Sequence, residues 1–292
     1  MRKRFNLLFI GLLVAVFSAG ALVPTDADAR SSKRKHAAVK SSKASSKGPY
    51  AVSAKSALVM EMVSGNKLYA QEITRKILPA STTKVLTAIL VLEKLNLDDY
   101  VTISARAANA LPSKIYAKVG DRYRVRDLLY AALLNSANDV AVALAEAVSG
   151  SEEAFVKLMN QRAAQIGAHG TLFANPHGLP ADDPQYSTAY DMALIFREAM
   201  KKEFFRQVIQ ERYHKIVSEQ GQITLLRSHN KCLFKGWKHD VYGKTGYTQA
   251  AQACFVGYVE KDQKQYIVAV FRCSKRWDDI KFIVERYVGV DL

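Results

Sequence analysis

Hydrophobic positions follow two different spacings along the chain, and the change comes after residue 201. Residues 81–95 are apolar on nearly every side, which predicts a helix buried in the middle of a domain. Apolar positions three and four apart predict further helices at residues 125–134, 139–148, 151–166 and 188–201. Apolar runs and alternations predict strands at residues 57–61, 67–70, 213–217, 223–226, 241–248, 253–259 and 265–272.

The order of these elements predicts an α+β fold. A hairpin signal, Ser64-Gly65-Asn66, joins the first two strands, and a second turn near residues 261–264 joins the last two. The spacing of Ile280, Ile283 and Tyr287 predicts a closing amphipathic helix. Strands followed by helices and then by strands again, with a hairpin late in the chain, favour an antiparallel sheet flanked by helices over a doubly wound parallel sheet.

The first 29 residues are typical of an export signal. Three basic residues at positions 2–4 precede an apolar run at 7–17, and Ala27-Asp28-Ala29 offers a small-x-small cleavage site. The low-polarity stretch at 5–23 also has about the length of a membrane-spanning helix, so an uncleaved N-terminal anchor remains an alternative. We expect an exported protein of the periplasm or cell envelope, either free or held by one helix.

Composition separates a basic segment from the remaining domain. The 292 residues are 49% apolar and 24% charged, which argues against disordered and multi-spanning membrane proteins. Residues 30–50 contain seven Lys or Arg and no acid among many Ser and Ala, which predicts a solvated tether. An exported basic tether suits anionic lipid or acidic wall polymers, with an inert spacer as the alternative. We predict no nucleic-acid partner and one folded domain at 51–292.

The sequence lacks the motifs of several common kinds of catalytic and metal site. The chain has no H-E-x-x-H, no G-x-S-x-G and no Cys/His cluster at metal spacing, so we predict no metal and no cofactor. The three cysteines, Cys232, Cys254 and Cys273, are an odd number without C-x-x-C. We expect buried, unpaired thiols.

One Ser-x-x-Lys segment stands at the start of the long buried helix. The pattern occurs four times, and only Ser81-Thr82-Thr83-Lys84 has this position. Helical spacing puts the hydroxyl and the amine on one face, where a neutral Lys84 could take the proton of an attacking Ser81. The alternatives are a helix N-cap for Ser81 and a surface position for Lys84.

Two further motifs follow in a fixed order. Ser136-Ala137-Asn138 stands at the junction of two predicted helices, and Lys244-Thr245-Gly246 stands on a predicted strand. This trio is shared by penicillin-binding proteins and class A β-lactamases. With Leu78-Pro79-Ala80, Asn175-Pro176-His177-Gly178-Leu179 and Tyr247-Thr248 around it, the chain from residue 53 onward resembles the low-molecular-mass penicillin-binding proteins, the serine D-alanyl-D-alanine carboxypeptidase and endopeptidase family.

The resemblance implies a fold, a substrate and catalytic roles. The fold would be that of serine β-lactamases and penicillin-binding proteins, an antiparallel sheet with flanking helices and a helical lobe. The substrates would be peptidoglycan stem peptides, with β-lactams as covalent inhibitors. Ser81 would be the nucleophile, Lys84 the base, and Ser136 the group that passes the proton to the leaving amine.

The resemblance also implies how substrate is held. Asn138 would hold the substrate amide, while Lys244 and Thr245 would bind the terminal carboxylate. Gly246 would let the substrate backbone approach, and the backbone N–H groups of Ser81 and Tyr247 would form the oxyanion hole.

Alternatives remain at this stage. A class A β-lactamase would need a Glu-x-x-x-Asn loop, and residues 172–184 contain Asn175 but no Glu, which favours a long-lived penicilloyl adduct. A wall-binding scaffold without catalytic activity is a second alternative.

His177 lies between Pro and Gly, and we interpret it as part of a turn. Many relatives carry a further β domain that this chain lacks, which leans toward cross-link cleavage.

Overall fold

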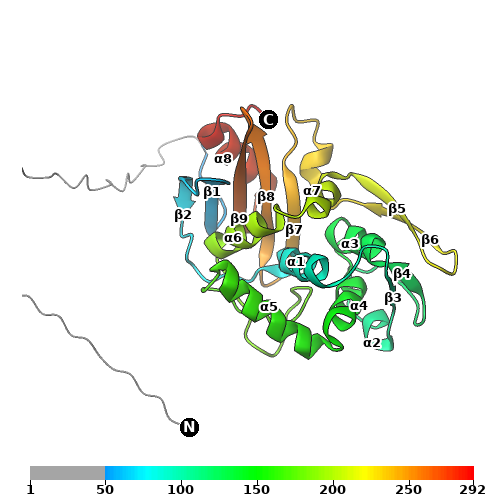
Figure 1. Cartoon of the computed structure of the whole chain (residues 1–292). Helices are drawn as coiled ribbons and strands as arrows, with labels where there is room; N and C mark the ends of the chain where they lie inside the picture. The colour runs from blue at the N-terminus through cyan, green and yellow to red at the C-terminus, as the bar shows by residue number, and fades with distance from the viewer. Residues whose placement is uncertain (1–49) are drawn as a thin grey trace, which may run out of the picture. The chain divides into compact units, whose positions relative to one another are not determined.

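The computed structural model describes residues 50–292, and a five-stranded antiparallel sheet forms its centre (Figure 1). The strand order is β2-β1-β9-β8-β7. The strands are β1 (Ser56–Glu61), β2 (Lys67–Gln71), β7 (Tyr242–Thr248), β8 (Gln252–Lys261) and β9 (Lys264–Cys273). Because β1 pairs with β9, the two ends of the described chain meet in one sheet and leave β7 at its edge. The predicted antiparallel α+β architecture is confirmed.

The sheet buries side chains on both faces. Val256 and Tyr258 of β8 enter the larger hydrophobic core, whereas Phe255 and Val259 enter a smaller one. Successive side chains of a strand point to opposite faces, so these two cores lie on opposite sides of the sheet.

The larger core joins the sheet to a helical lobe. Helix α6 (Ala189–Ala199) packs against β1, β8 and β9, and α1 (Lys84–Lys94) packs against the other helices of the lobe. Helix α1 is buried from its first residue to Val91, as its apolar sequence predicts. The helices around it are α3 (Val125–Leu133), α4 (Asn138–Ser149), α5 (Glu152–Ile166) and α6, and α7 (Glu203–Gln210) packs against α3 and β7.

The smaller core lies under the C-terminal helix. Helix α8 (Arg276–Ile283) packs on β8 and β9, and its π-helical extension η3 (Val284–Val288) reaches β1 and β2. Buried Asp279 of α8 accepts hydrogen bonds from Tyr50 and from the backbone and hydroxyl of Ser53. These bonds tie the start of the described chain to its end.

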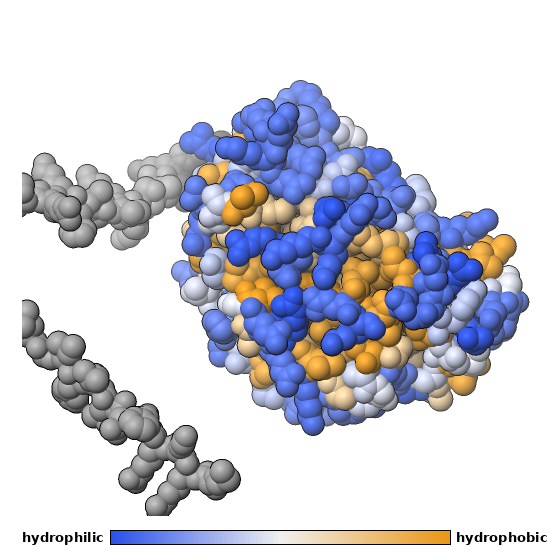
Figure 2. Space-filling view, in the orientation of Figure 1, coloured by the Kyte–Doolittle hydropathy of each residue, from blue (hydrophilic) through white to orange (hydrophobic). Residues whose placement is uncertain are grey.

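Two small sheets complete the fold, and the sequence predicted the strands of only one of them. Strands β5 (Tyr213–Val217) and β6 (Ile223–Arg227) pair in a hairpin that forms its own sheet, followed by η2 (Lys231–Phe234). Apolar surface is visible where this hairpin projects (Figure 2), because its outward face includes exposed Ile223 and Leu225. The other small sheet is the pair of β3 (Tyr100–Thr102) and β4 (Arg122–Arg124), and α2 (Ala105–Ala108) lies between them in the chain. These elements were not predicted, because segments of three or four residues are too short to show a periodic pattern.

The three cysteines are buried and unpaired, as expected from the sequence. None of the helices within residues 50–292 is long and apolar enough to cross a bilayer. The predicted export signal and nearly all of the predicted tether lie outside the described residues.

Candidate active site

The predicted nucleophile lies in a tight turn ahead of α1. Ser81 belongs to the 3-10 helix η1 (Ala80–Thr83), and α1 (Lys84–Lys94) begins only at the next residue. No side chain caps either helix, so Ser81 is not the N-cap that the sequence left open. Ala80 adopts a left-handed backbone conformation with φ of 47°, which turns the chain sharply before the serine.

The Asn175-to-Leu179 segment supports this turn from the other side. A Cβ atom at Gly178 would lie 1.9 Å from the Ala80 carbonyl oxygen, so only glycine permits this approach. Asn175 Oδ1 accepts hydrogen bonds from the backbone N–H groups of His177 and Gly178, at 3.3 and 2.6 Å. The segment is therefore the turn that its Pro and Gly predict.

Lys84 is completely buried beside the nucleophile, which excludes the surface position that the sequence left open. Its Nζ atom lies 3.3 Å from Ser81 Oγ, 2.6 Å from Asn138 Oδ1 and 3.0 Å from the His177 carbonyl oxygen. Burial, assisted by the positive charge of Lys244, lowers the pKa of Lys84 well below its ordinary value. A neutral amine next to a hydroxyl is the arrangement that activates a serine.

Ser136 and Lys244 form a second pair across the site. Lys244 Nζ donates to Ser136 Oγ at 2.9 Å and to the Thr245 carbonyl at 3.0 Å. Burial, and then the charge of Arg276, lower the pKa of Lys244 to about 7. Ser136 itself has a φ of 60°, a strained conformation for a residue with a side chain and one that concentrates at functional sites.

Asn138 lies against Lys84, and its side chain is 1% exposed. Its Oδ1 accepts from Lys84, and its Nδ2 donates to the Leu111 carbonyl at 2.8 Å. Both ends of the amide are thus engaged inside the protein, and the residue does not line the cavity described next. This geometry gives Asn138 a direct role in positioning the lysine, which the sequence did not predict.

A cavity of about 430 Å³, here called the active-site cavity, opens in front of Ser81 and along the free edge of β7. Its walls include Ser81, Ser136, Thr245, Gly246, Tyr247 and Arg276. A Cβ atom at Gly246 would lie 3.0 Å from the Ser81 backbone nitrogen, so this glycine lets β7 pack directly against the nucleophile turn.

Arg276 is a site residue that the sequence did not reveal. Its Nη1 atom donates to the carbonyl oxygens of Gly246 and Cys254, at 2.9 and 2.8 Å, while the residue also lines the active-site cavity. Burial lowers the pKa of its guanidinium. A single arginine after a strand carries no motif, and only the folded sheet brings it next to β7.

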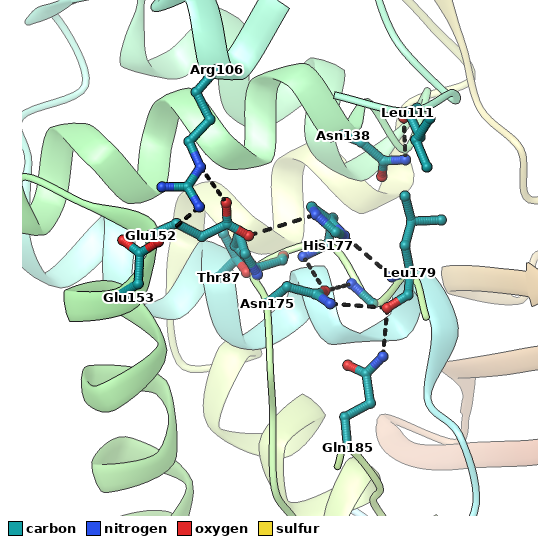
Figure 3. A network of polar contacts seen from close by, with 12 residues as sticks. Thr87, Arg106, Leu111, Asn138, Glu152, Glu153, Asn175, His177, Leu179 and Gln185 are labelled. Carbon is teal, nitrogen blue, oxygen red and sulfur yellow. Dashed lines mark hydrogen bonds and ion pairs between the residues drawn. The ribbon is translucent and has the colours of Figure 1, made fainter. Parts of the chain in front are cut away.

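Two histidines near the site are held neutral. Burial and the charge of Lys84 lower the pKa of His177 to about 3, and burial likewise lowers that of His229 to about 4. His177 Nδ1 accepts from the Leu179 N–H at 3.2 Å, and Nε2 faces Glu152 at 3.7 Å (Figure 3). His177 contributes to the site through its backbone carbonyl on Lys84. Within residues 50–292, no three metal-ligating side chains gather at one place.

This arrangement of side chains can support acyl transfer to a serine, and the chain is similar to known enzymes. A family model described as D-alanyl-D-alanine carboxypeptidase matches residues 40–275. The chain belongs to this family. The D-alanyl-D-alanine carboxypeptidase DacF of Bacillus subtilis is 32% identical over 279 residues, which cover 94% of this chain and 67% of DacF.

Solved structures agree with this assignment. A D-alanyl-D-alanine carboxypeptidase from Mycobacterium tuberculosis matches with a TM-score of 0.77 at 29% identity, covering 84% of this chain and 96% of that one. A DD-transpeptidase from Streptomyces matches with a TM-score of 0.76 at 28% identity, covering 82% and 99%. The family, fold and enzyme class predicted from the sequence are confirmed: the chain is a serine DD-peptidase of the penicillin-binding-protein fold.

Proposed function

We propose that this DD-peptidase acts as a carboxypeptidase on peptidoglycan stem peptides, through an acyl-enzyme on Ser81. The observation that carries the proposal is the pairing of Ser81 with Lys84, whose buried Nζ atom lies 3.3 Å from the hydroxyl oxygen. The lowered pKa of Lys84 supports a neutral amine that accepts the Ser81 proton near neutral pH.

The proposed acylation forms one bond, breaks another and moves one proton. Ser81 Oγ bonds to the carbonyl carbon between the two D-alanine residues, and Lys84 takes the hydroxyl proton. The backbone N–H groups of Ser81 and Tyr247 stabilise the oxyanion. The C–N bond then breaks, and Ser136 relays the proton taken up by Lys84 to the leaving amine. Water finally releases the acyl group; an amine in its place would give transpeptidation.

The terminal carboxylate of the substrate would bind beside the second lysine. Arg276 and Thr245 line the active-site cavity, and Lys244 lies behind its wall, where its Nζ atom donates to the lining residue Ser136. A carboxylate near Lys244 would raise the pKa of that amine and so keep it charged. These three residues would therefore select peptides that end in a free carboxyl group.

Intact-protein mass spectrometry with benzylpenicillin tests this function. Residues 30–292 should form one covalent adduct that is absent from the Ser81→Ala variant, and the unmodified enzyme should release D-alanine from a stem pentapeptide. Comparing that pentapeptide with a cross-linked dimer decides between carboxypeptidase and endopeptidase activity. No adduct and no D-alanine would instead support a silent wall-binding scaffold.

A β-lactamase is the nearest alternative, and the lining of the active-site cavity disfavours it. Within the described part of the chain, no Asp or Glu lines this cavity. The absence of a general base typically slows a proton-transfer step by about 10²–10⁴-fold. Such a loss in hydrolysis of the acyl-enzyme would turn rapid turnover of the drug into a trapped adduct. The penicilloyl group on Ser81 should therefore persist; a transient adduct with consumption of the drug would identify a β-lactamase.

We further propose export to the periplasm or cell envelope by the signal at residues 1–29. The basic segment at 30–50 would then hold the enzyme near anionic lipid or acidic wall polymers. Deleting residues 30–47 should release the enzyme from the envelope fraction without changing hydrolysis of soluble peptides. Unchanged fractionation would mean an inert spacer, and a retained leader in the mature protein would mean an anchor.

A further inference from the structure

Residues 111–117, here called the lining segment, border the active-site cavity without belonging to a helix or a strand. The segment lies in the chain between α2 and β4, and Ser113 is its residue in the cavity lining. No helical turn or strand ladder fixes such a segment. Its position therefore depends on individual hydrogen bonds to neighbouring elements.

Asn138, at the start of α4, forms two of these hydrogen bonds. Its backbone N–H donates to the Ser113 carbonyl at 2.7 Å. Its Nδ2 atom donates to the Leu111 carbonyl at 2.8 Å (Figure 3). The Oδ1 atom of the same amide accepts from Lys84 Nζ at 2.6 Å. The lining segment thus fixes the amide that in turn orients the buried amine.

Asp139, the next residue of α4, holds the other end of the lining segment. Its carboxylate accepts from the backbone N–H groups of Ile115, at 3.1 and 3.2 Å, and of Ala117, at 3.4 Å. It also accepts from the N–H of Val140 in its own helix at 2.9 Å. The residue is completely buried. A buried carboxylate is costly unless donors satisfy it, so α4 and the lining segment depend on each other at this point.

These contacts distinguish Asp139 from an ordinary acid in the first turn of a helix. Such an acid interacts with the N–H groups of its own helix, as Asp139 does with Val140. Its other two donors lie 24 and 22 residues earlier in the chain. The acylation chemistry proposed above gives this carboxylate no role, yet its contacts lead to the amide beside the catalytic lysine.

We propose that Asp139 is a positioning residue for acylation, which holds the lining segment against α4. The lining segment keeps the Asn138 amide oriented, and the amide keeps the Lys84 amine in place. The distance of 3.3 Å between Lys84 Nζ and Ser81 Oγ is already long for a hydrogen bond, so a small rotation of the amine breaks this contact. The inference rests on the proposed function, in which Lys84 is the base.

Penicillin acylation measured at several drug concentrations tests this inference, because it separates the saturating acylation rate from drug binding. Asp139→Asn replaces one carboxylate oxygen by an amino group, which cannot accept a hydrogen bond, so one backbone N–H loses its partner. We expect the saturating rate to fall by about 10²-fold, as a displacement of about 1 Å at a reacting group can cause. The half-saturating drug concentration should change little.

Asp191→Asn is the matched control. Asp191 is also a buried acid in the first turn of a helix, α6, where it accepts from the Thr171 hydroxyl at 2.7 Å. This variant should keep the wild-type acylation rate. Rates are compared at the pH optimum of each variant, because the charge of Asp139 opposes the burial and the Lys244 charge that lower the pKa of Lys84.

A combined variant shows whether Asp139 acts through Asn138. If it does, Asp139→Asn should slow Asn138→Ala far less than it slows wild type, since the amide that it positions is already gone. A purely structural role would multiply the two losses. Lys114→Met provides a milder test, because it removes another contact of the lining segment, from Lys114 Nζ to the Ala108 carbonyl at 2.6 Å. It should lower the saturating rate by about threefold or more.

The outcomes separate this role from the catalytic function. An unchanged saturating rate in Asp139→Asn would overturn the inference, and so would losses that multiply in the combined variant. A higher half-saturating concentration at an unchanged rate would also overturn it, because the lining segment would then only shape the cavity. If Asp139→Asn does not fold, wild-type acylation by Lys114→Met would overturn it. All of these results leave the proposed function standing, whereas no penicillin adduct in wild type would overturn both.

Discussion

The Nζ atom of Lys84 lies 2.6 Å from Oδ1 of Asn138, closer than it lies to the serine that it would deprotonate. A neutral amide oxygen at this distance orients the amine without supplying a negative charge. The lysine therefore keeps the lowered pKa that burial and Lys244 impose on it.

Replacing that amide by an isosteric carboxylate should shift the pH dependence of acylation. Asn138→Asp places a charge next to the buried amine, which raises the pKa of Lys84 and keeps it protonated near neutral pH. The acidic limb of the rate of penicillin acylation should move up by at least about one pH unit. Asn138→Ala is the matched control, since it removes the acceptor without adding charge. An unmoved limb in Asn138→Asp would mean that Lys84 is not the base.

Lys244→Met should stabilise the fold while it abolishes peptide hydrolysis. The pKa of Lys244 falls from its ordinary 10.5 to about 7, so the unfolded chain binds more protons between these pH values. Wild type therefore loses stability as pH falls from 10.5 to about 7, by at most about 5 kcal/mol, and no further below that.

Urea unfolding at several pH values measures this effect. Lys244→Met should increase the free energy of unfolding, and this increase should grow as pH is lowered toward 7. The hydrogen bonds that Lys244 no longer makes reduce the increase by a fixed amount. Lys264→Met is the control, because Lys264 is exposed and its charge stays in water in both the folded and the unfolded state. A gain that is the same at every pH would show that the amine is not held near its proposed pKa.

Gly178→Ala should inactivate the enzyme through the backbone. The new Cβ atom would lie 1.9 Å from the Ala80 carbonyl oxygen, so the nucleophile turn would have to move. A displacement of about 1 Å can cost 10²-fold in rate, and we expect at least that loss in penicillin acylation. Gly150→Ala is the comparison, since it has a similar positive φ but nothing within 4 Å of the added atom. It should cost about 1 kcal/mol of stability and leave acylation intact.

Arg276→Met should weaken recognition of the terminal carboxylate. Arg276 lines the active-site cavity, and its replacement by Met removes one positive charge from the cavity wall. The ratio of kcat/KM between a peptide ending in D-alanine and its C-terminal amide should fall by about tenfold or more. Leaving the Gly246 and Cys254 carbonyls unpaired should also destabilise the fold by about 1–3 kcal/mol, which thermal unfolding reports separately. A ratio equal to that of wild type would assign the carboxylate to Lys244 and Thr245 alone.

Much of this fold follows from local patterns. Helix α1 is apolar nearly all round because it is surrounded by other elements, and its sequence predicts that burial. The late hairpin of β8 and β9 was predicted because its strands are contiguous and joined by a short turn. The pair β3 and β4 was missed because three-residue strands carry no periodicity, and η1 was missed because the turn depends on Ala80 fitting against a glycine nearly 100 residues later.

The sequence by itself determined the family and the candidate site residues, because Ser81, Lys84, Ser136, Asn138 and the Lys-Thr-Gly segment stand in recognisable local motifs. Only the tertiary structure decided what surrounds them. It placed Asn138 on Lys84 and brought Arg276 to β7. Short-range spacing specifies which groups are present, whereas burial, pKa and hydrogen-bond partners depend on contacts between residues far apart in the chain.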